Sequence, residues 1–230
     1  VGKRATWTSV RAPWGEVAAG SWDTRIAAYA SSWPADHPGL LTYSHEPEND
    51  GGDPKLFVAA TKRFYAVARP ALPAGVKIGP VAMGWTFDPL NHSTQRADYF
   101  DPISAESCDF AGLDVYNPYH FPPAGNDPRW WAAPMKRLIA FLDWCSARGV
   151  PPAIGETACA QDVTGASGNP DGTAAKIQWV TDSIAAVEAA GGLAFCYFDT
   201  LVNDDLDPSA LIEAQPEFAA AWKAAAAAHA

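Results

Sequence analysis

The sequence predicts a single α/β domain in which a parallel sheet is covered by helices. Short runs rich in β-branched and aromatic residues alternate with longer alanine-rich amphipathic stretches, as in repeated strand–helix units. Six such units follow one another, with strand starts roughly 40 residues apart. Glycines and prolines fall mostly between these segments, and no linker-like stretch divides the 230 residues. We therefore expect one domain with one sheet.

The elements can be assigned in order along the chain. The predicted strands span residues 4–10, 40–46, 76–82, 110–116, 152–156 and 193–199. The predicted helices span residues 22–32, 54–69, 99–105, 134–148, 172–190 and 208–228. The helical periodicity is clearest in 134–148, where apolar residues recur every three or four positions, and weakest in 99–105.

The composition excludes several classes of partner. There are 16 basic and 26 acidic residues, so the net charge is −10 and the overall field repels phosphate backbones. No apolar run approaches the roughly 18 residues that a membrane-spanning helix needs. We therefore expect a soluble protein that binds neither nucleic acid nor membranes. Nothing in the sequence fixes an oligomeric state.

The four cysteines, at positions 108, 145, 159 and 196, form no CxxC pair, so metal binding through sulfur is not expected. An even count in a tryptophan-rich chain favours a secreted or cell-surface protein. By the direction of the predicted elements, Cys108 could pair with Cys145, and Cys159 with Cys196. Buried thiols are an equally ordinary interpretation.

Polar residues close the predicted strands, which is the end of a parallel α/β fold where ligands bind. Glu46 lies in HEPEND at the end of the second strand, and Glu156 lies in GETACAQD at the end of the fifth. In the fourth strand, Asp114 and Tyr116 share one face, and Tyr197 lies in YFDT at the end of the sixth. In a closed barrel, the two glutamates would face each other across one opening.

Two carboxyl groups facing each other across a cleft are what glycoside hydrolysis requires. One protonates the leaving oxygen, while the other attacks the anomeric carbon or activates water. A separation of about 5 to 5.5 Å gives retention of configuration, and about 6.5 to 9.5 Å gives inversion. The sequence therefore predicts Glu46 and Glu156 as a catalytic pair.

HEPEND and IGET, with YNP between them, resemble the clan A glycoside hydrolases, a retaining superfamily with a (β/α)₈ fold. The histidine before Glu46 is similar to the family 26 mannanase group. The resemblance implies that Glu46 is the acid/base, that Glu156 is the nucleophile and that Tyr116 donates a hydrogen bond to the nucleophile. It implies a retaining, endo-acting hydrolase of polysaccharides that needs no cofactor.

The resemblance extends to TSVRAPWGEVAAGSWD, where Arg11 stands in place of a common lysine and Trp14 would stack on a sugar. Trp85, which follows the third strand, is a second candidate platform. His45, Asp114, Asn117 and Tyr197 complete the expected substrate-binding set. Glu48 is a rival acid, although Pro47 makes a regular continuation of the strand doubtful. His45 is also a candidate for a purely structural histidine.

Placing Glu46 at the end of strand four and Glu156 at the end of strand seven makes the visible strands three to eight. The first two βα units of a TIM (β/α)₈-type barrel are then missing, and an incomplete or unusually closed barrel is expected. This departure leaves open an alternative, a catalytically inert carbohydrate-binding or cell-surface domain derived from such a barrel. A metal-dependent hydrolase is not expected, because the five histidines form no HxH or HExxH pair.

Overall fold

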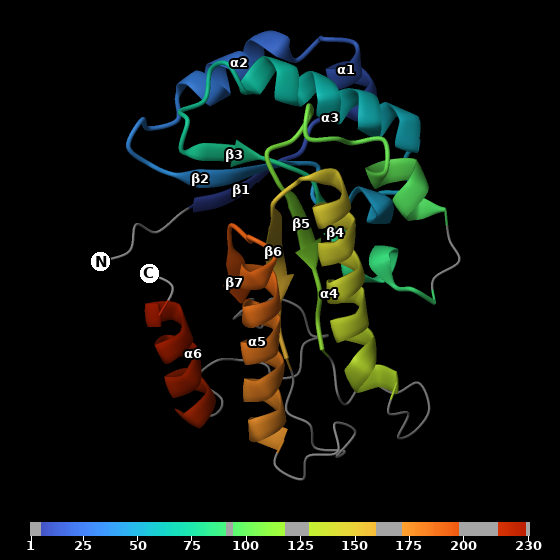
Figure 1. Ribbon diagram of the computed structural model, residues 1–230. Helices are drawn as coiled ribbons and strands as arrows, with labels where there is room; N and C mark the ends of the chain where they lie inside the picture. The colour runs from blue at the N-terminus through green and yellow to red at the C-terminus, as the bar shows by residue number, and fades with distance from the viewer. Residues whose placement is uncertain (1–5, 91–93, 118–128, 160–171, 198–215, 229–230) are drawn as a thin grey trace.

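The computed structural model describes residues 6–90, 94–117, 129–159, 172–197 and 216–228 (Figure 1). The strands are β1 (Thr6–Val10), β2 (Gly39–Tyr43), β3 (Val76–Ile78), β4 (Val81–Met83), β5 (Ala111–Asp114), β6 (Pro152–Thr157) and β7 (Phe195–Tyr197). The α-helices are α1 (Trp14–Ala18), α2 (Asp23–Ser31), α3 (Pro54–Ala68), α4 (Arg129–Arg148), α5 (Gly172–Ala189) and α6 (Pro216–Ala228). Three short helical turns, η1 (Pro47–Asn49), η2 (Gly84–Phe87) and η3 (Arg96–Phe100), lie in the loops.

All six predicted strands are present, and every pairing between neighbours is parallel. The strand order is β1-β2-β3 in one sheet and β4-β5-β6-β7 in the other. β3 and β4 are the two halves of the predicted strand 76–82, so one chain segment belongs to both sheets. The described strands therefore follow one another in sequence order, as in a (β/α) barrel.

The break between β3 and β4 falls at Gly79 and Pro80. Proline has no N–H with which to continue the ladder. A Cβ at Gly79 would lie 2.1 Å from the carbonyl oxygen of Phe110, so only glycine fits at this crossing. The backbone stays paired on both sides of the break, because Gly79 N–H donates to Leu41 and Gly112 N–H donates to the Pro80 carbonyl.

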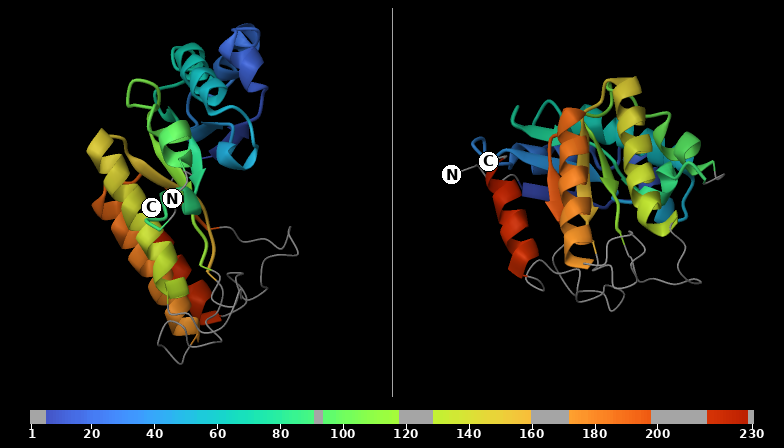
Figure 2. Two further views of the ribbon diagram at one scale, coloured as in Figure 1. Left: turned by 90° about the vertical axis from the view of Figure 1, so that its right-hand side faces the viewer. Right: turned by 60° about the horizontal axis from the view of Figure 1, so that its bottom comes forward.

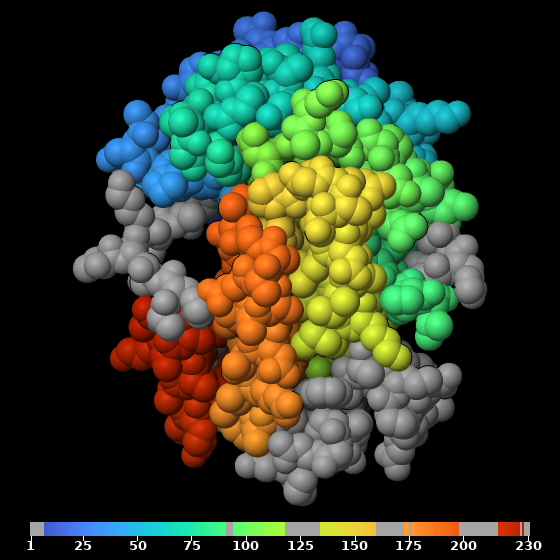
Figure 3. Space-filling model, in the orientation of Figure 1, coloured from blue at the N-terminus to red at the C-terminus, as the bar shows by residue number. Residues whose placement is uncertain are grey.

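The helices form an outer layer over each sheet. Figure 1 shows α1, α2 and α3 above β1–β3, and Figure 2 shows α4, α5 and α6 together on one side of β4–β7. In the space-filling view, α4 and α5 lie side by side, with α6 next to α5 (Figure 3). Each sheet has its own apolar cluster, and Trp14 packs against both.

The barrel is not closed over the described residues. β1 and β7 are the outer strands of the two sheets, and no described strand joins them. The prediction of an incomplete barrel is therefore confirmed for this part of the chain. No helix in the described ranges combines the length and apolarity that crossing a membrane requires.

Several element boundaries differ from the prediction. The predicted strand 40–46 ends at Tyr43, because Ser44 and Glu46 adopt left-handed backbone conformations with φ of 55° and 52°. Helix α1 was not predicted, and the predicted helix 99–105 is replaced by the π-helical turn η3. Helix α4 begins at Arg129 rather than 134, so Pro134 lies inside it.

The predicted disulfides are wrong. All four cysteines are thiols, and none of the pairs is bonded. Cys108 and Cys145 are buried in the same apolar cluster, and Cys108 donates to the Ser104 carbonyl oxygen. Proximity of the element ends did not bring the sulfur atoms to bonding geometry, which needs specific Cβ directions. The cysteines therefore give no support to export from the cell.

Candidate active site

Glu46 lies at the carboxyl end of β2 in a sharp turn. Its backbone is left-handed, with φ 52° and ψ 56°, and its N–H donates at 3.0 Å to the Val81 carbonyl of β4, a strand of the other sheet. Asn49 donates from Nδ2 to Glu46 Oε2 at 3.2 Å. The turn lifts the half-buried Glu46 side chain away from the regular strand direction and keeps it accessible.

Glu156 is positioned by a β-bulge. Leu113 pairs with Ile154, but Asp114 pairs with Glu156, so Gly155 is an extra residue on β6. The bulge sets Glu156 opposite Asp114. The Tyr116 hydroxyl, from the residues following β5, donates to Glu156 Oε2 at 2.5 Å. Burial raises the pKa of Tyr116 far above its ordinary value, and the hydrogen bond to Glu156 is the second cause of this rise. The phenol therefore keeps its proton.

His45 and Asp114 form a buried pair beside Glu156. Nε2 of His45 is hydrogen-bonded to Asp114 Oδ2 and lies 3.9 Å from Glu156 Oε1. Burial raises the pKa of Asp114 to about 8 against the opposing effect of His45. Burial lowers the pKa of His45, but the contact with Asp114 and the nearby Glu156 and Glu46 raise it overall. Both groups of the pair therefore release their protons at higher pH than they would alone in water.

The carboxylate of Glu46 belongs to the same electrostatic cluster. Its charge contributes to the raised pKa values of His45, Asp114 and Tyr116, after the larger effects of burial and direct hydrogen bonds. The structure thus brings together five predicted site residues from β2, β5, β6 and the segments that follow them: Glu46, His45, Asp114, Tyr116 and Glu156.

His45, Asp114 and Glu156 are also the residues that could hold a metal ion. Among the described residues, they form a His–carboxylate set with ligand atoms within 4.8 Å of one another. His45 and Asp114 bind each other, and Glu156 accepts from Tyr116. These hydrogen bonds give the cluster a role without a metal.

Three comparisons relate the chain to known proteins. No protein-family model matches the sequence, and no curated protein matches it. Solved structures do match. A fungal β-1,4-galactanase matches with a TM-score of 0.55 and 15% sequence identity, over 81% of this chain and 59% of that one. The modular endo-β-1,4-mannanase of Cellulomonas fimi matches with a TM-score of 0.55 and 17% identity, over 90% of this chain and 47% of that one. Cel5A of Thermotoga maritima, solved with mannotriose, matches with a TM-score of 0.51 and 10% identity, over 90% of this chain and 67% of that one.

The chain therefore shares the parallel (β/α) barrel fold of these solved glycanases. The chain spans about half to two thirds of the length of these enzymes, with 59%, 47% and 67% covered. An open run of consecutive parallel strands agrees with this partial coverage.

A cavity of about 400 Å³ is lined by Arg11, Trp14, Asp50 and Ser44, the residue before His45. Trp14 Nε1 donates to Ser44 Oγ at 2.7 Å. Its ring is half-buried and packs on Phe57, with centroids 5.4 Å apart. Arg11 is largely exposed and lies 3.6 Å from Asp50. Arg11 and Trp14 therefore line one cavity, and Trp14 is held firmly by its contacts.

The structure also places three other predicted residues, Trp85, Asn117 and Tyr197. Trp85 is half-buried in η2, after β4. Asn117 is buried and pairs with Cys159 through an isolated bridge. Tyr197 exchanges hydrogen bonds with the Cys159 backbone and packs on rings of α6, with centroids 5.4 Å from Phe218. The described contacts of Asn117 and Tyr197 thus support the framework behind the cluster.

The sequence analysis missed two features of the site. Asn49, which donates to Glu46, stands three residues later in HEPEND, a spacing that a tight turn brings together. Glu48 is not exposed beside Glu46 but buried, with 6% of its surface accessible. Pro47 was the only local signal for this turn, since it ends the strand.

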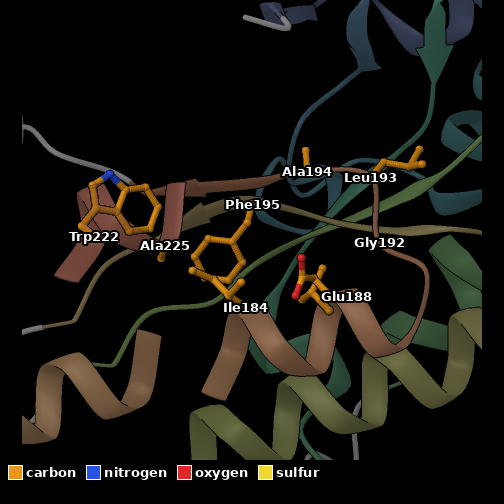
Figure 4. Close-up of a pocket in the computed structure, with 9 residues that line it drawn as sticks. Ile184, Glu188, Gly192, Leu193, Ala194, Phe195, Trp222 and Ala225 are labelled. Carbon is orange, nitrogen blue, oxygen red and sulfur yellow. The ribbon is translucent and has the colours of Figure 1, made fainter. Parts of the chain in front are cut away.

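A second cavity, of about 350 Å³, lies between α5, α6 and the start of β7 (Figure 4). Its lining is mainly apolar, with Ile184, Phe195 and Trp222 around it and Glu188 at one side. The residues Gly192–Ala194 that line it precede β7, so it lies toward the amino end of the strand. It is therefore separate from the carboxylate cluster, which lies at the carboxyl ends.

Proposed function

We propose that this protein is a retaining endo-β-1,4-glycan hydrolase, with Glu46 as the acid/base and Glu156 as the nucleophile. The observation that carries the proposal is the hydrogen bond from Tyr116 to Glu156 beside the His45–Asp114 pair. One carboxylate is thereby oriented and solvent-accessible at the end of β6, while the other is presented by the turn after β2. The solved structures of similar fold are β-1,4-galactanases, mannanases and glucanases, which supports this substrate class.

The proposed reaction has two steps. In the first, Glu156 attacks the anomeric carbon, and Glu46 gives its proton to the glycosidic oxygen as that bond breaks. In the second, Glu46 takes a proton from water, and the water oxygen displaces Glu156 from the sugar. The protein ends in its starting protonation state, and the configuration at the anomeric carbon is retained.

The surrounding side chains have separate roles in this scheme. Tyr116 orients the Glu156 carboxylate and donates to one of its oxygens, leaving Oε1 to attack. The half-buried Trp14 and the exposed Arg11, on the adjacent cavity, would contact neighbouring sugar units. The chain's net charge of −10 suits a neutral rather than an acidic polysaccharide.

The test is hydrolysis of β-1,4-mannan, β-1,4-galactan and β-1,4-glucan, with the anomer of the first product followed by NMR. Wild type should release oligosaccharides with retained configuration. Glu156→Ala should lose nearly all activity. Glu46→Ala should cleave a dinitrophenyl glycoside, whose leaving group needs no acid, and azide should raise its turnover by replacing the attacking water. Inverted product, or full activity in Glu156→Ala, would show that the assignment is wrong.

The open sheet favours a second candidate, a carbohydrate-binding domain without turnover. Glu46 lies on the first sheet and Glu156 on the second, and β1 and β7 are edges in the described residues. Catalysis needs the two carboxyl groups held within roughly half an ångström of the productive geometry. Binding of β-1,4-glycans that is unchanged by Glu46→Gln, with no hydrolysis by wild type, would support this candidate.

A further inference from the structure

Glu48 is a buried carboxylic acid two residues after Glu46, and the proposed reaction gives it no role. Only 6% of its surface is accessible. Oε1 accepts two hydrogen bonds, from the Met83 N–H at 2.7 Å and from the Thr86 hydroxyl at 2.6 Å. Oε2 is buried and has no hydrogen-bond partner among the described residues. A carboxylate in this position is costly to bury, so its presence there needs an explanation.

The two donors to Glu48 flank Trp85. Met83 ends β4, and Thr86 lies in η2, so one oxygen of Glu48 fixes the turn that carries Trp85 between them. Thr86 is itself buried, which excludes water from this contact. The carboxylate therefore ties the turn after β2 to the turn after β4.

The same carboxylate supports the conformation of Glu46. A non-glycine residue in the left-handed region is unfavourable and persists only where its surroundings enforce it. Glu46 is held from one side by its N–H bond to Val81 and from the other by the short turn η1, whose central residue is Glu48. Because η1 has a single turn, anchoring Glu48 to β4 also anchors Glu46.

We infer that Glu48 is a positioning residue, which holds the acid/base Glu46 and the Trp85 turn in a fixed relation to each other. This inference rests on the proposed function for the role of Glu46. It replaces the interpretation of Glu48 as a rival acid, because the carboxyl group is buried and accepts hydrogen bonds from the Met83 backbone of β4 and the Thr86 hydroxyl of η2.

The environment of Glu48 makes this anchor sensitive to pH. Burial raises the pKa of Glu48 to about 7, against the hydrogen bonds from Thr86 and Met83. The titratable groups that act on it are Glu46, on its own turn, and Tyr99, from η3; Met83 and Thr86 are uncharged. Near pH 5, the anchor is therefore a neutral acid. Above pH 7, it carries a buried charge, and one of its oxygens has no hydrogen-bond partner in the described part of the chain.

The experiment compares Glu48→Leu and Glu48→Gln with a surface control, Glu106→Gln. Each is assayed on the polysaccharide that wild type cleaves and on a dinitrophenyl glycoside of the same sugar. The aryl group leaves without protonation, so its cleavage needs Glu156 but no acid. Glu48→Leu should lower kcat/KM on the polysaccharide by about 10- to 100-fold, with the aryl glycoside affected less than about threefold.

Glu48→Gln keeps the acceptor oxygen but does not titrate. At pH 5, its activity should be close to that of wild type. If the pH–activity profile of wild type has a step near pH 7, that step should be absent from the profile of Glu48→Gln. An equal loss on both substrates in Glu48→Leu would mean a general structural role and would overturn the inference, as would no loss on either. Unchanged behaviour in Glu106→Gln is required for either conclusion.

Crystal structures make the inference independent of the proposed function. If wild type hydrolyses no glycan, the proposed function fails, and the structure of Glu48→Leu decides whether Glu48 is an anchor. Displacement of Glu46 and Trp85 relative to β4 would support positioning. Unmoved side chains at both positions would overturn it.

Discussion

Gly155 and Asp114 are in such close contact that a Cβ at position 155 would lie 2.6 Å from Asp114 Oδ1. This glycine is the extra residue of the bulge that turns Glu156 toward the cluster. The glycine of GET is thus explained by its contact with the carboxylate that holds His45. The bulge that places Glu156 therefore needs a residue as small as glycine at position 155.

Gly155→Ala should force Asp114 away from His45 and shift Glu156. We expect a loss of about 1 to 3 kcal/mol in the free energy of unfolding, typical of overpacking, and at least about a tenfold loss of hydrolysis. Gly15→Ala is the matched control, because a Cβ there meets nothing within 4 Å. Urea unfolding and initial rates measure both effects. Equal behaviour of the two variants would contradict the packing argument.

Tyr116→Phe removes the hydrogen bond to Glu156 without changing the ring. A bond to a charged group contributes about 1.5 to 3 kcal/mol, so kcat/KM should fall by about 10- to 100-fold. Tyr65→Phe serves as the control, since Tyr65 donates to Asp109 at 2.9 Å away from the cluster. Steady-state kinetics of both variants tests this; equal activity in Tyr116→Phe and wild type would remove the proposed orienting role.

The stability of the fold should fall as pH rises. Burial raises the pKa of Glu48 to about 7 and that of Asp114 to about 8, from 4.5 and 3.8. Between these pKa values, the folded state binds protons that the unfolded chain has released. The stabilisation is therefore greatest when the pH is below the pKa values of the unfolded chain, and it is lost as the pH rises through the pKa values of the folded protein. The raised pKa of His45 acts in the same direction.

Urea unfolding at pH 5 and pH 8 should therefore give the larger free energy at pH 5. Glu48→Gln should reduce the difference by up to about 3 kcal/mol, since the amide does not titrate. Glu106→Gln, on the surface, should leave it unchanged. Greater stability at pH 8 in wild type would show that these carboxyl groups are not buried as described.

The thiols should be slow to react in the folded protein. Burial raises the pKa of Cys108 to about 12 and that of Cys196 to about 11, which leaves little thiolate at neutral pH. Titration with a thiol reagent should find four reactive cysteines after denaturation without reductant. Fewer than four would indicate a disulfide and contradict the structure.

Much of the fold could be predicted because its signals are local. Alternation of apolar runs and amphipathic stretches located all six strands and most helices. The break at Gly79 depends on the Phe110 carbonyl, about thirty positions away, so no local pattern reveals it. The helix α1 was missed because it has only five residues, too few to show periodicity.

The site was predictable where residues end strands and unpredictable where turns redirect them. Glu46, Asp114 and Glu156 were found because parallel strands bring their carboxyl ends together. The burial of Glu48 follows from the turn at Pro47, and the pairing of Glu156 with Asp114 follows from a bulge. Both depend on contacts between distant segments. The alternation of apolar and polar residues along one strand does not predict such contacts.

The segment Val76–Met83, which contains the Gly79–Pro80 break, would affect the anomeric configuration of the product in the proposed reaction. Glu46 follows a strand of the first sheet and Glu156 ends a strand of the second, and this segment belongs to both. The backbone at the break therefore connects the two sheets that carry these carboxyl groups. A change of a few ångströms separates the geometry for direct attack from one that admits a water molecule. In the proposed reaction, the choice between one displacement and two would thus depend on a backbone segment far from either glutamate in sequence.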